Sequence, residues 1–358
     1  MAAFHCPTKI YTGENALQAL RKFPSGRVLV VTDRYFSKEG KAAEIAKLVP
    51  GAQVQVFDRV VPDPPASLAA EGAAVCRKFR PDILIALGGG SPMDCAKAMK
   101  IAYGEPVLFV AVPTTSGSGS EMTSFSILTH NGIKHPLVDD ALRPDVAILD
   151  AELLSQLPSG LIADTGMDLL AHCMEALVAT GRTGMSDALA CHGARMVFEN
   201  LERSFHGDRS VRLALHEAAS MAGMAFDNAG LGVCHALAHA IGGAFHIPHG
   251  RLCSILLPEV IRLNQKAALG QYAMLAKLCD LSGATQRLGV RNLIIAIGRL
   301  QRNLLLPQTL GQAGIKKEQW EEKESSICAA ALADACCKTN PVAVTEQDLL
   351  EILKAVRP

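Results

Sequence analysis

An aspartate and several histidines stand at spacings that suit metal coordination. Asp168 lies four residues before His172, and His235 lies four residues before His239, so the members of each pair share one face of a helix. His249 follows a segment with two glycines, which is expected to break the helix and bring this histidine back toward the others. A carboxylate combined with imidazoles suits a borderline divalent cation such as Fe²⁺, Zn²⁺, Ni²⁺ or Mn²⁺.

A structural role without a metal is the alternative for each of these residues. A lone histidine in an apolar helix is usually a core or solvated residue, which is the expectation for His206, His216 and His246. A single polar pair at i,i+4 spacing is also common on helices. Two such pairs, followed by Pro-His-Gly at 248–250 in an otherwise apolar sequence, favour metal binding, because buried ionisable groups need a partner or a metal.

The composition is that of a globular protein with a sizeable core. The chain has 358 residues, of which 49% are hydrophobic and 20% charged, so it is long enough for two domains. Lysine plus arginine and aspartate plus glutamate both number 35, and no long basic run occurs. Binding to nucleic acid or to an anionic membrane therefore has no electrostatic support, and no apolar run reaches the length of a membrane span.

The first residues and the cysteines indicate the compartment. The segment Met-Ala-Ala-Phe-His-Cys-Pro at 1–7 lacks the basic and apolar regions of a signal peptide. There are 11 cysteines, they are scattered, and no Cys-x2-Cys occurs. We expect reduced cysteines, most of them in the core, in a cytoplasmic protein.

The first half of the chain alternates β-rich runs with helical stretches. Strands are expected at 27–33, 53–58, 82–87, 107–112 and 146–150. This alternation predicts a parallel sheet with helices on both faces. Segments 124–130 and 134–138, joined by Asn131-Gly132, are typical of a β-hairpin.

After residue 152 alanine, leucine, methionine and glutamate recur at helical spacing, and β-rich runs almost vanish. We therefore predict an α/β domain over 1–152 that binds NAD and an all-α domain over 153–358 that holds the metal. Glycine-containing breaks are expected at 230–232, 242–243 and 250. The strongest helix predictions are 161–180, 184–205, 208–228, 251–265 and 345–356.

Two loops after successive strands have the composition of a phosphate or ribose site. Segment 88–97, Gly-Gly-Gly-Ser-Pro-Met-Asp-Cys-Ala-Lys, ends a strand and opens a helix, whose N-terminus favours anions. Segment 113–121 is dense in hydroxyls and glycines. A strand terminator and a polar surface turn are the structural alternatives. Both loops are expected at the carboxyl edge of one sheet, where α/β folds bind ligands.

Asp33 ends an earlier strand of the same predicted sheet. Its carboxylate can accept a hydrogen bond from a ribose hydroxyl and would repel a 2′-phosphate, which favours NAD over NADP. A helix N-cap is the equally open structural interpretation.

These residues and their order resemble the iron-containing (group III) alcohol dehydrogenases along nearly the whole chain. A likeness to the 1-propanol dehydrogenases of bacterial microcompartments rests on segments 132–137, 165–168 and 245–250. Ser118, where threonine is common, and Asp63, where asparagine is often seen, depart from the pattern. The matching segments are 88–97, 113–121, 144–150, 165–172, 232–239, 248–250, 256–258 and 339–341.

The resemblance implies a fold of the dehydroquinate synthase-like type, with a dinucleotide-binding α/β domain followed by an all-α domain. It implies that Asp168, His172, His235 and His249 bind the metal, and that the catalytic residue His239 lies beside it without being a ligand. The residues expected to contact the cofactor are Asp33, Gly89, Gly90, Ser91, Asp94, Thr114, Thr115, Ser118 and Lys134.

The expected activity is hydride transfer between NAD(H) and a small primary alcohol or aldehyde such as 1-propanol or propanal. Fe²⁺ is the expected metal, with Zn²⁺ as an alternative in purified protein, and it would polarise the carbonyl oxygen while His239 relays a proton. We expect a homodimer or larger homo-oligomer, cytoplasmic or inside a bacterial microcompartment with a shell protein as partner, and no nucleic-acid or membrane partner.

Three alternatives remain at this point. One is a lactaldehyde, 1,2-diol or glycerol-type polyol dehydrogenase. Another is a lyase of the same fold, which would need a basic pocket for an acidic substrate, whereas lysine and arginine are sparse around 165–180 and 232–250. The third is a non-catalytic microcompartment component, against which the full set of candidate ligands and both loops argue.

Overall fold

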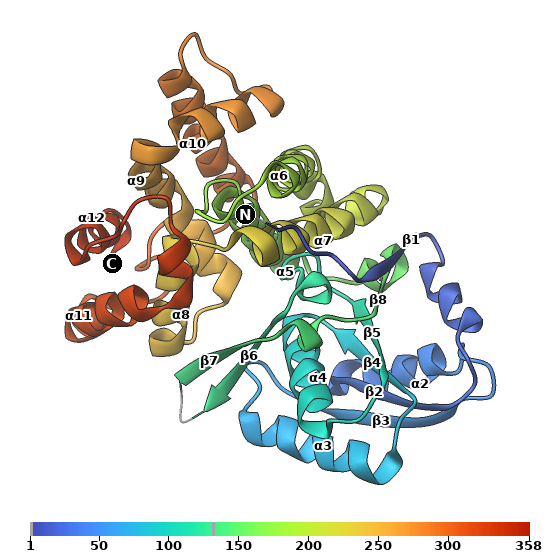
Figure 1. Cartoon of the computed structure of the whole chain (residues 1–358). Coiled ribbons are helices and arrows are strands. Elements are labelled where there is room, and N and C mark those ends of the chain that lie inside the picture. The colour runs from blue at the N-terminus through green and yellow to red at the C-terminus, as the bar shows by residue number, and fades with distance from the viewer. Residues whose placement is uncertain (1–2, 131–132) are drawn as a thin grey trace. The chain divides into compact units, whose positions relative to one another are not determined.

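The computed structural model describes residues 3–130 and 133–358, and these form two compact units (Figure 1). One unit is Cys6–Leu157, and the other is Pro158–Pro358 together with the N-terminal residues up to His5. The division falls after residue 157, a few residues beyond the boundary drawn from the sequence, because the short turn Ala151–Leu154 still belongs with the sheet.

The first unit contains a six-stranded sheet whose neighbouring strands, among the described residues, pair in parallel, as predicted. The order is β1-β8-β5-β4-β2-β3. The strand β3 therefore lies on one side of β2 and β4 on the other, so the strand order changes direction between β2 and β4. In open α/β sheets ligands bind at such a switch point, outside the carboxyl ends of the strands. The strands are β1 (Lys9–Gly13), β2 (Arg27–Asp33), β3 (Gln53–Val60), β4 (Ile83–Gly88), β5 (Leu108–Pro113) and β8 (Val146–Asp150).

Helices cover both faces of this sheet because alternate strand residues point to opposite sides. Val28 and Val30 pack with residues of η1 (Ala16–Lys22) and α2 (Lys41–Ala46). Leu29 and Val31 pack instead with α3 (Ala66–Phe79) and α4 (Gly90–Tyr103). Both faces of the central strands are buried, which explains their continuous apolar sequences.

The predicted hairpin is present as two antiparallel strands, β6 (Phe125–His130) and β7 (Ile133–Val138), with Phe125 opposite Val138. The predicted turn Asn131-Gly132 lies outside the described residues. A short parallel bridge joins Thr129 of β6 to Pro65, just before α3.

The second unit is helical throughout its described elements. The helix α9 is longer than the sequence predicts and contains Pro258, with non-helical backbone at Ala268. Its helices are α5 (Ser159–Ala176), α6 (Gly184–Phe205), α7 (Arg212–Ala229), α8 (Val233–Phe245), α9 (His249–Leu278), α10 (Gln286–Asn303), α11 (Lys317–Ala333) and α12 (Glu346–Val356), with the short turns η5 (Arg209–Val211) and η6 (Ala335–Thr339).

Two of the predicted glycine breaks are wrong. Gly242 lies inside α8 and Gly250 inside the first turn of α9. The chain turns between them, at His246, whose φ of 56° is left-handed. A Cβ on Gly242 would lie 3.4 Å from a methyl carbon of Leu252, an ordinary van der Waals contact, so α8 packs against α9 at this glycine.

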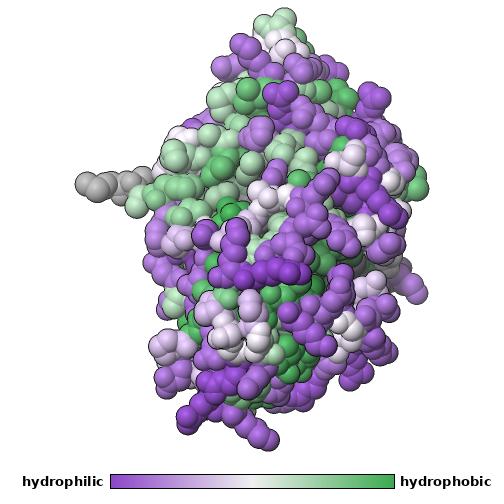
Figure 2. All heavy atoms as spheres, turned by 90° about the vertical axis from the view of Figure 1, so that its right-hand side faces the viewer, coloured by the Kyte–Doolittle hydropathy of each residue, from purple (hydrophilic) through white to green (hydrophobic). Residues whose placement is uncertain are grey.

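The surface carries many polar residues on the face that Figure 2 shows. On the face shown in Figure 2, hydrophilic residues cover much of the area, with hydrophobic residues interspersed. Among the described residues no helix combines the length and the apolar character needed to cross a membrane.

Candidate functional site

Three helices of the second unit bring a carboxylate and two imidazoles together. Asp168 comes from the middle of α5, His235 from the first turn of α8 and His249 from the first residue of α9. Asp168 Oδ1 lies 3.7 Å from His235 Nε2 and 3.5 Å from His249 Nε2. Residues from three separate segments therefore point their donor atoms at one small volume.

The start of α9 is held against α5 in a way that places His249. A Cβ on Gly250 would lie 2.0 Å from the carbonyl oxygen of Asp164, so a larger residue cannot stand there without displacing backbone. The Arg251 guanidinium also donates two hydrogen bonds to the Asp164 carboxylate, at 3.1 and 2.9 Å. The Pro-His-Gly segment of the sequence is thus a close contact between two helices.

The other two histidines of the paired motifs lie beside this cluster. The His172 ring stacks on His235, with 4.4 Å between ring centroids, and on Phe226. The His239 ring is nearly parallel to that of His249, with centroids 5.1 Å apart. His172 is not among the residues whose ligand atoms all lie within 4.8 Å of one another, whereas Cys253 is, with Asp168, His235 and His249.

The cluster perturbs the ionisation of its members strongly. Burial alone would raise the pKa of Asp168, but the surrounding imidazoles hold it below its ordinary value. Burial would lower the pKa of His235, but the Asp168 and Glu175 carboxylates raise it to about 10. Burial lowers the pKa of His249 well below its usual value, helped by the other histidines. Such opposed shifts in one place are typical of functional sites.

Glu175 is a residue of this site that sequence reasoning missed. Its carboxylate accepts hydrogen bonds from the backbone N–H groups of Gly232 (2.9 Å) and Cys234 (2.7 Å), at the N-terminus of α8. It also lies 2.7 Å from His235 Nδ1. The carboxylate therefore satisfies free N–H groups at a positive helix end and fixes the orientation of the imidazole, which leaves Nε2 facing Asp168.

A glycine is required next to Glu175. A Cβ on Gly232 would lie 2.7 Å from both Glu175 Oε1 and Asn340 Oδ1. The Glu175 side chain is three residues after His172 and seven after Asp168, on the same face of α5. That spacing was the available signal for its role.

The donor atoms fit a divalent cation. In residues 3–130 and 133–358, Asp168 Oδ1 and His235 Nε2 are buried without a hydrogen-bond partner, an arrangement that costs free energy unless something binds them. Asp168 is 8% exposed and His235 1%. Carboxylate oxygen and imidazole nitrogen are ordinary ligands of Fe²⁺ and Zn²⁺.

His239 has a carboxylate partner that the sequence did not reveal. Its Nδ1 lies 2.9 Å from Oδ2 of Asp334, which precedes η6, and Cys336 completes a group whose ligand atoms lie within 4.8 Å. Burial alone would raise the pKa of Asp334, but the hydrogen bond with His239 lowers it to about 2. Asp334 therefore fixes the ring and leaves Nε2 for other contacts.

In the first unit the two glycine-containing loops lie side by side, as predicted. They follow the neighbouring strands β4 and β5, and Thr114 N–H donates to the Gly88 carbonyl at 3.0 Å. A Cβ on Gly88, whose φ is 149°, would lie 2.4 Å from Pro92, and a Cβ on Gly89 would lie 3.0 Å from Thr115 Oγ1. Side chains are thereby kept out of the space in front of α4.

A buried lysine fastens the second loop to α4. Lys97 Nζ donates to Ser120 Oγ (3.1 Å), the Thr123 carbonyl (2.8 Å) and the Phe125 carbonyl (2.6 Å). Burial raises the pKa of the neighbouring Asp94 to about 7, against the opposing effect of the Lys97 charge. The predicted cofactor residues on these loops that remain half-buried, and hence accessible, are Gly89, Gly90, Ser91, Asp94, Thr115 and Ser118, whereas Thr114 is buried.

The remaining two predicted cofactor residues have protein partners. Asp33 is the N-cap of α1 (Arg34–Lys38), where its Oδ1 accepts from the N–H groups of Tyr35 and Phe36 at 2.9 and 3.3 Å. The observed contacts of Asp33 are therefore those of a helix N-cap. Both hydrogen bonds go to Oδ1, and neither goes to Oδ2. Lys134 Nζ lies 2.7 Å from Asp63 Oδ1, the residue noted as a departure from the family pattern.

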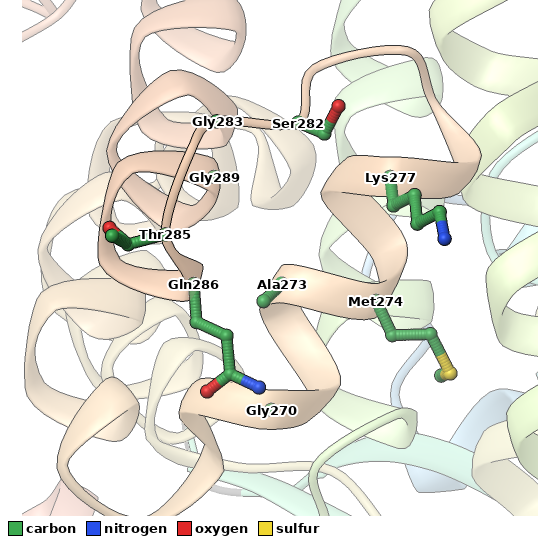
Figure 3. A pocket seen from close by; sticks show the side chains of 9 residues that line it. All are labelled: Gly270, Ala273, Met274, Lys277, Ser282, Gly283, Thr285, Gln286 and Gly289. Carbon is green, nitrogen blue, oxygen red and sulfur yellow. The ribbon is translucent and has the colours of Figure 1, made fainter.

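A pocket of about 320 Å³ elsewhere in the helical unit lacks such chemistry (Figure 3). It lies between α9 and the start of α10, and its lining contains one charged side chain, Lys277. It offers neither paired titratable groups nor a set of metal donors, which separates it from the histidine cluster.

Comparison with known proteins agrees with the family expected from the sequence. Residues 7–151 match the model of the iron-containing alcohol dehydrogenases, and residues 162–357 match that of the C-terminal part of the Fe-containing alcohol dehydrogenase family. The chain belongs to the iron-containing alcohol dehydrogenase family, and it is a dehydrogenase by class.

Two curated relatives and one solved structure illustrate the similarity. The chain is 37% identical to an NADPH-dependent butanol dehydrogenase of Clostridium saccharobutylicum, over 99% of this chain and 98% of that one. It is 36% identical to the 1-propanol dehydrogenase PduQ of Citrobacter freundii, over 99% of both chains. A crystal structure of a 1,3-propanediol oxidoreductase is 31% identical and superposes with a TM-score of 0.92, over 99% of this chain and 100% of that one. The predicted fold is confirmed by this likeness.

Proposed function

We propose that this protein interconverts small primary alcohols and aldehydes, such as 1-propanol and propanal, with NAD(H) and a bound Fe²⁺ ion. The observation that carries the proposal is the convergence of Asp168, His235 and His249, in which Asp168 Oδ1 and His235 Nε2 are buried and lack hydrogen-bond partners among the described residues. The family supports the reaction class. The α/β unit would bind the nucleotide and the helical unit the cation.

In this proposal the helical unit holds the cation and orients its ligands. Asp168, His172, His235 and His249 are the ligands, and Glu175 fixes the His235 ring through Nδ1. When bound, the cation supplies Lewis-acid polarisation of the carbonyl oxygen, and Zn²⁺ is its alternative in purified protein.

His239 moves the proton. Reduction of an aldehyde consumes one hydride from NADH and one proton, and oxidation of the alcohol returns both. The His239 ring packs on His249, and Asp334 binds its Nδ1, so Nε2 is the atom that delivers or accepts the proton. Asp334 acts as a positioning residue for this ring.

The nucleotide is bound by the loops at the carboxyl edge of the sheet. Gly89, Gly90 and Ser91 at the start of α4 hold phosphate oxygens through backbone N–H groups, with Asp94, Thr114, Thr115 and Ser118 around them. Asp33 caps α1 with Oδ1 and accepts from a ribose hydroxyl with Oδ2, which favours NAD(H). Lys134 contacts the cofactor only if its ion pair with Asp63 opens.

A substrate panel tests the proposal. Anaerobically purified, iron-loaded protein should oxidise NADH with propanal and butanal as substrates. The rate should be lower with lactaldehyde or dihydroxyacetone as the substrate, and lower when NADPH replaces NADH. The names of the two relatives, a butanol and a 1-propanol dehydrogenase, support short unbranched substrates. Preference for lactaldehyde or glycerol would favour the polyol dehydrogenase alternative, and no turnover with any aldehyde would contradict the proposal.

The cellular setting and the assembly are part of the same proposal. The likeness to a 1-propanol dehydrogenase supports residence in the cytoplasm or inside a microcompartment, with a shell protein as partner. The active form is proposed to be a homodimer or a larger homo-oligomer. Light scattering of the purified protein and co-purification with shell proteins test these two points, and a monomer that never associates with shells would contradict both.

A further inference from the structure

Cys253 stands next to the candidate ligands but belongs to none of the paired motifs. It follows His249 by four residues on α9, so the two side chains share one face of the helix. Its side chain is fully buried, and its Sγ lies 3.5 Å from His249 Nε2. The Sγ, the two imidazole nitrogens and the Asp168 oxygen all lie within 4.8 Å of one another.

These separations are those expected between neighbouring ligands of one metal ion. Metal bonds of about 2.1 Å to nitrogen and oxygen and about 2.3 Å to sulfur place two neighbouring N/O donors about 3.4 Å apart and an N/S pair about 3.6 Å apart. The observed distances are 3.5 Å from Asp168 Oδ1 to His249 Nε2, 3.7 Å from Asp168 Oδ1 to His235 Nε2 and 3.5 Å from His249 Nε2 to Cys253 Sγ. Cys253 therefore lies where a further ligand of the same ion would stand.

A lone cysteine would not define a site, but two other atoms point to one. Asp168 Oδ1 and His235 Nε2 are buried and, in the described part of the chain, have no hydrogen-bond partner. Both belong to the same group of donors as the sulfur. A cation bound by these two atoms would therefore lie within reach of the Cys253 sulfur.

We propose that Cys253 is a sulfur ligand of the bound cation, in addition to the ligands expected from the family. The inference rests on the metal site of the proposed function. On binding, the sulfur gives its proton to solvent and coordinates as the thiolate. Because thiolate is a soft donor, it favours Zn²⁺ and Co²⁺ over Fe²⁺, so this chain retains zinc more firmly than a site of carboxylate and imidazole alone.

Cobalt substitution tests the proposal without any measurement of turnover. The Co²⁺-loaded wild-type protein should show a sulfur-to-cobalt charge-transfer band in the near ultraviolet. Cys253→Ser should lose this band but keep the visible d–d bands of bound cobalt, and its affinity for Zn²⁺ should fall by about 10–100-fold, more than its affinity for Fe²⁺. Cys328→Ser is the matched control, since that thiol is also fully buried but lies on α11, outside the cluster, and should change nothing.

X-ray absorption on zinc-loaded wild-type protein keeps the proposal testable if Cys253→Ser does not fold. A zinc–sulfur distance of about 2.3 Å is expected. Spectra that require nitrogen and oxygen neighbours only, or a charge-transfer band that persists in Cys253→Ser, would overturn the role of Cys253 and leave the proposed function intact. Failure of the wild-type protein to bind any divalent cation would instead overturn the proposed function.

Discussion

The two candidate sites of this molecule, the histidine cluster of the helical unit and the loops at the sheet edge, consist of different kinds of chemical group. The site in the helical unit consists of ionisable side chains from α5, α8 and α9, and the groups nearest its centre, Asp168 and His235, are almost fully buried. The edge of the sheet consists of glycines and hydroxyl-bearing residues in two loops, most of them half-buried. In the proposed function the first site therefore depends on individual side chains, whereas the second depends mostly on backbone N–H groups.

The electrostatics of the two sites differ in the same way. The Asp168 and Glu175 carboxylates raise the pKa of His235, whereas burial and the neighbouring histidines lower the pKa of His249. At the sheet edge the large shift is that of Asp94, whose pKa burial raises to about 7. Single substitutions should therefore have much larger effects in the helical unit than at the sheet edge.

The largest effect is expected for His249→Ala. Loss of a ligand should empty the site and lower kcat/KM by more than about a hundredfold, since outer-shell partners of a metal are already worth about 10–100-fold. Metal analysis and turnover are measured on the same preparation. His192→Ala, an exposed histidine of α6, is the control and should behave as wild type. A variant that keeps both stoichiometric metal and normal turnover would show that His249 is not a ligand.

His239→Ala should keep most of its metal but lose about 10²–10⁴ in the rate of hydride transfer, because one positioned proton-transfer group is typically worth that much. Asp334→Asn should lose less and shift the pH profile of kcat, since it disturbs the orientation of the same ring. Single-turnover kinetics and metal analysis together decide this. If metal disappears in step with activity, His239 is a ligand.

Glu175→Gln should weaken the metal site without emptying it. The amide keeps the shape of the side chain but removes the charge that orients His235 and stabilises the N-terminus of α8. Metal affinity should fall by about 10–100-fold in a competition titration with a chelator. Glu199→Gln, an exposed partner of Arg195, is the matched control. Equal metal affinities in both variants would show that Glu175 acts only as a cap of α8.

The smallest effect is expected at the sheet edge, for Asp33→Gly. Removing a negative charge near a 2′-phosphate should raise the activity with NADPH relative to NADH by about five- to tenfold. Asp33→Asn should give a similar gain while keeping an oxygen to cap α1. A cofactor ratio unchanged in both variants would leave Asp33 as a helix cap alone.

The strands of the sheet were largely predictable because their two buried faces produce continuous apolar runs. The predicted strands 27–33 and 146–150 match β2 and β8 residue for residue, and the other three differ by one or two positions at their ends. The strand β1 was missed since it is short, none of its residues is fully buried, and it lies at the sheet edge. The helices α10 and α11 were not among the predicted helices.

The histidine cluster was predictable in part because its members come in pairs at helical spacing. The carboxylates that contact the cluster could not be predicted from the sequence. Glu175 meets His235 across 60 residues of sequence, and Asp334 meets His239 across 95, so both contacts depend on how the helices pack. Gly242 also lies inside α8, where the sequence suggested a break, and the chain turns at His246 instead.

The central claim is that a cation held by the helical unit is required for aldehyde reduction with NADH. Metal-free protein, prepared with a chelator under anaerobic conditions, is titrated with Fe²⁺ while NADH oxidation by propanal is followed. The account predicts that activity is absent at the start, rises in proportion to bound iron and levels off at an equimolar amount, whereas His249→Ala stays inactive. Turnover in the metal-free protein, or a rate independent of added iron, would contradict it.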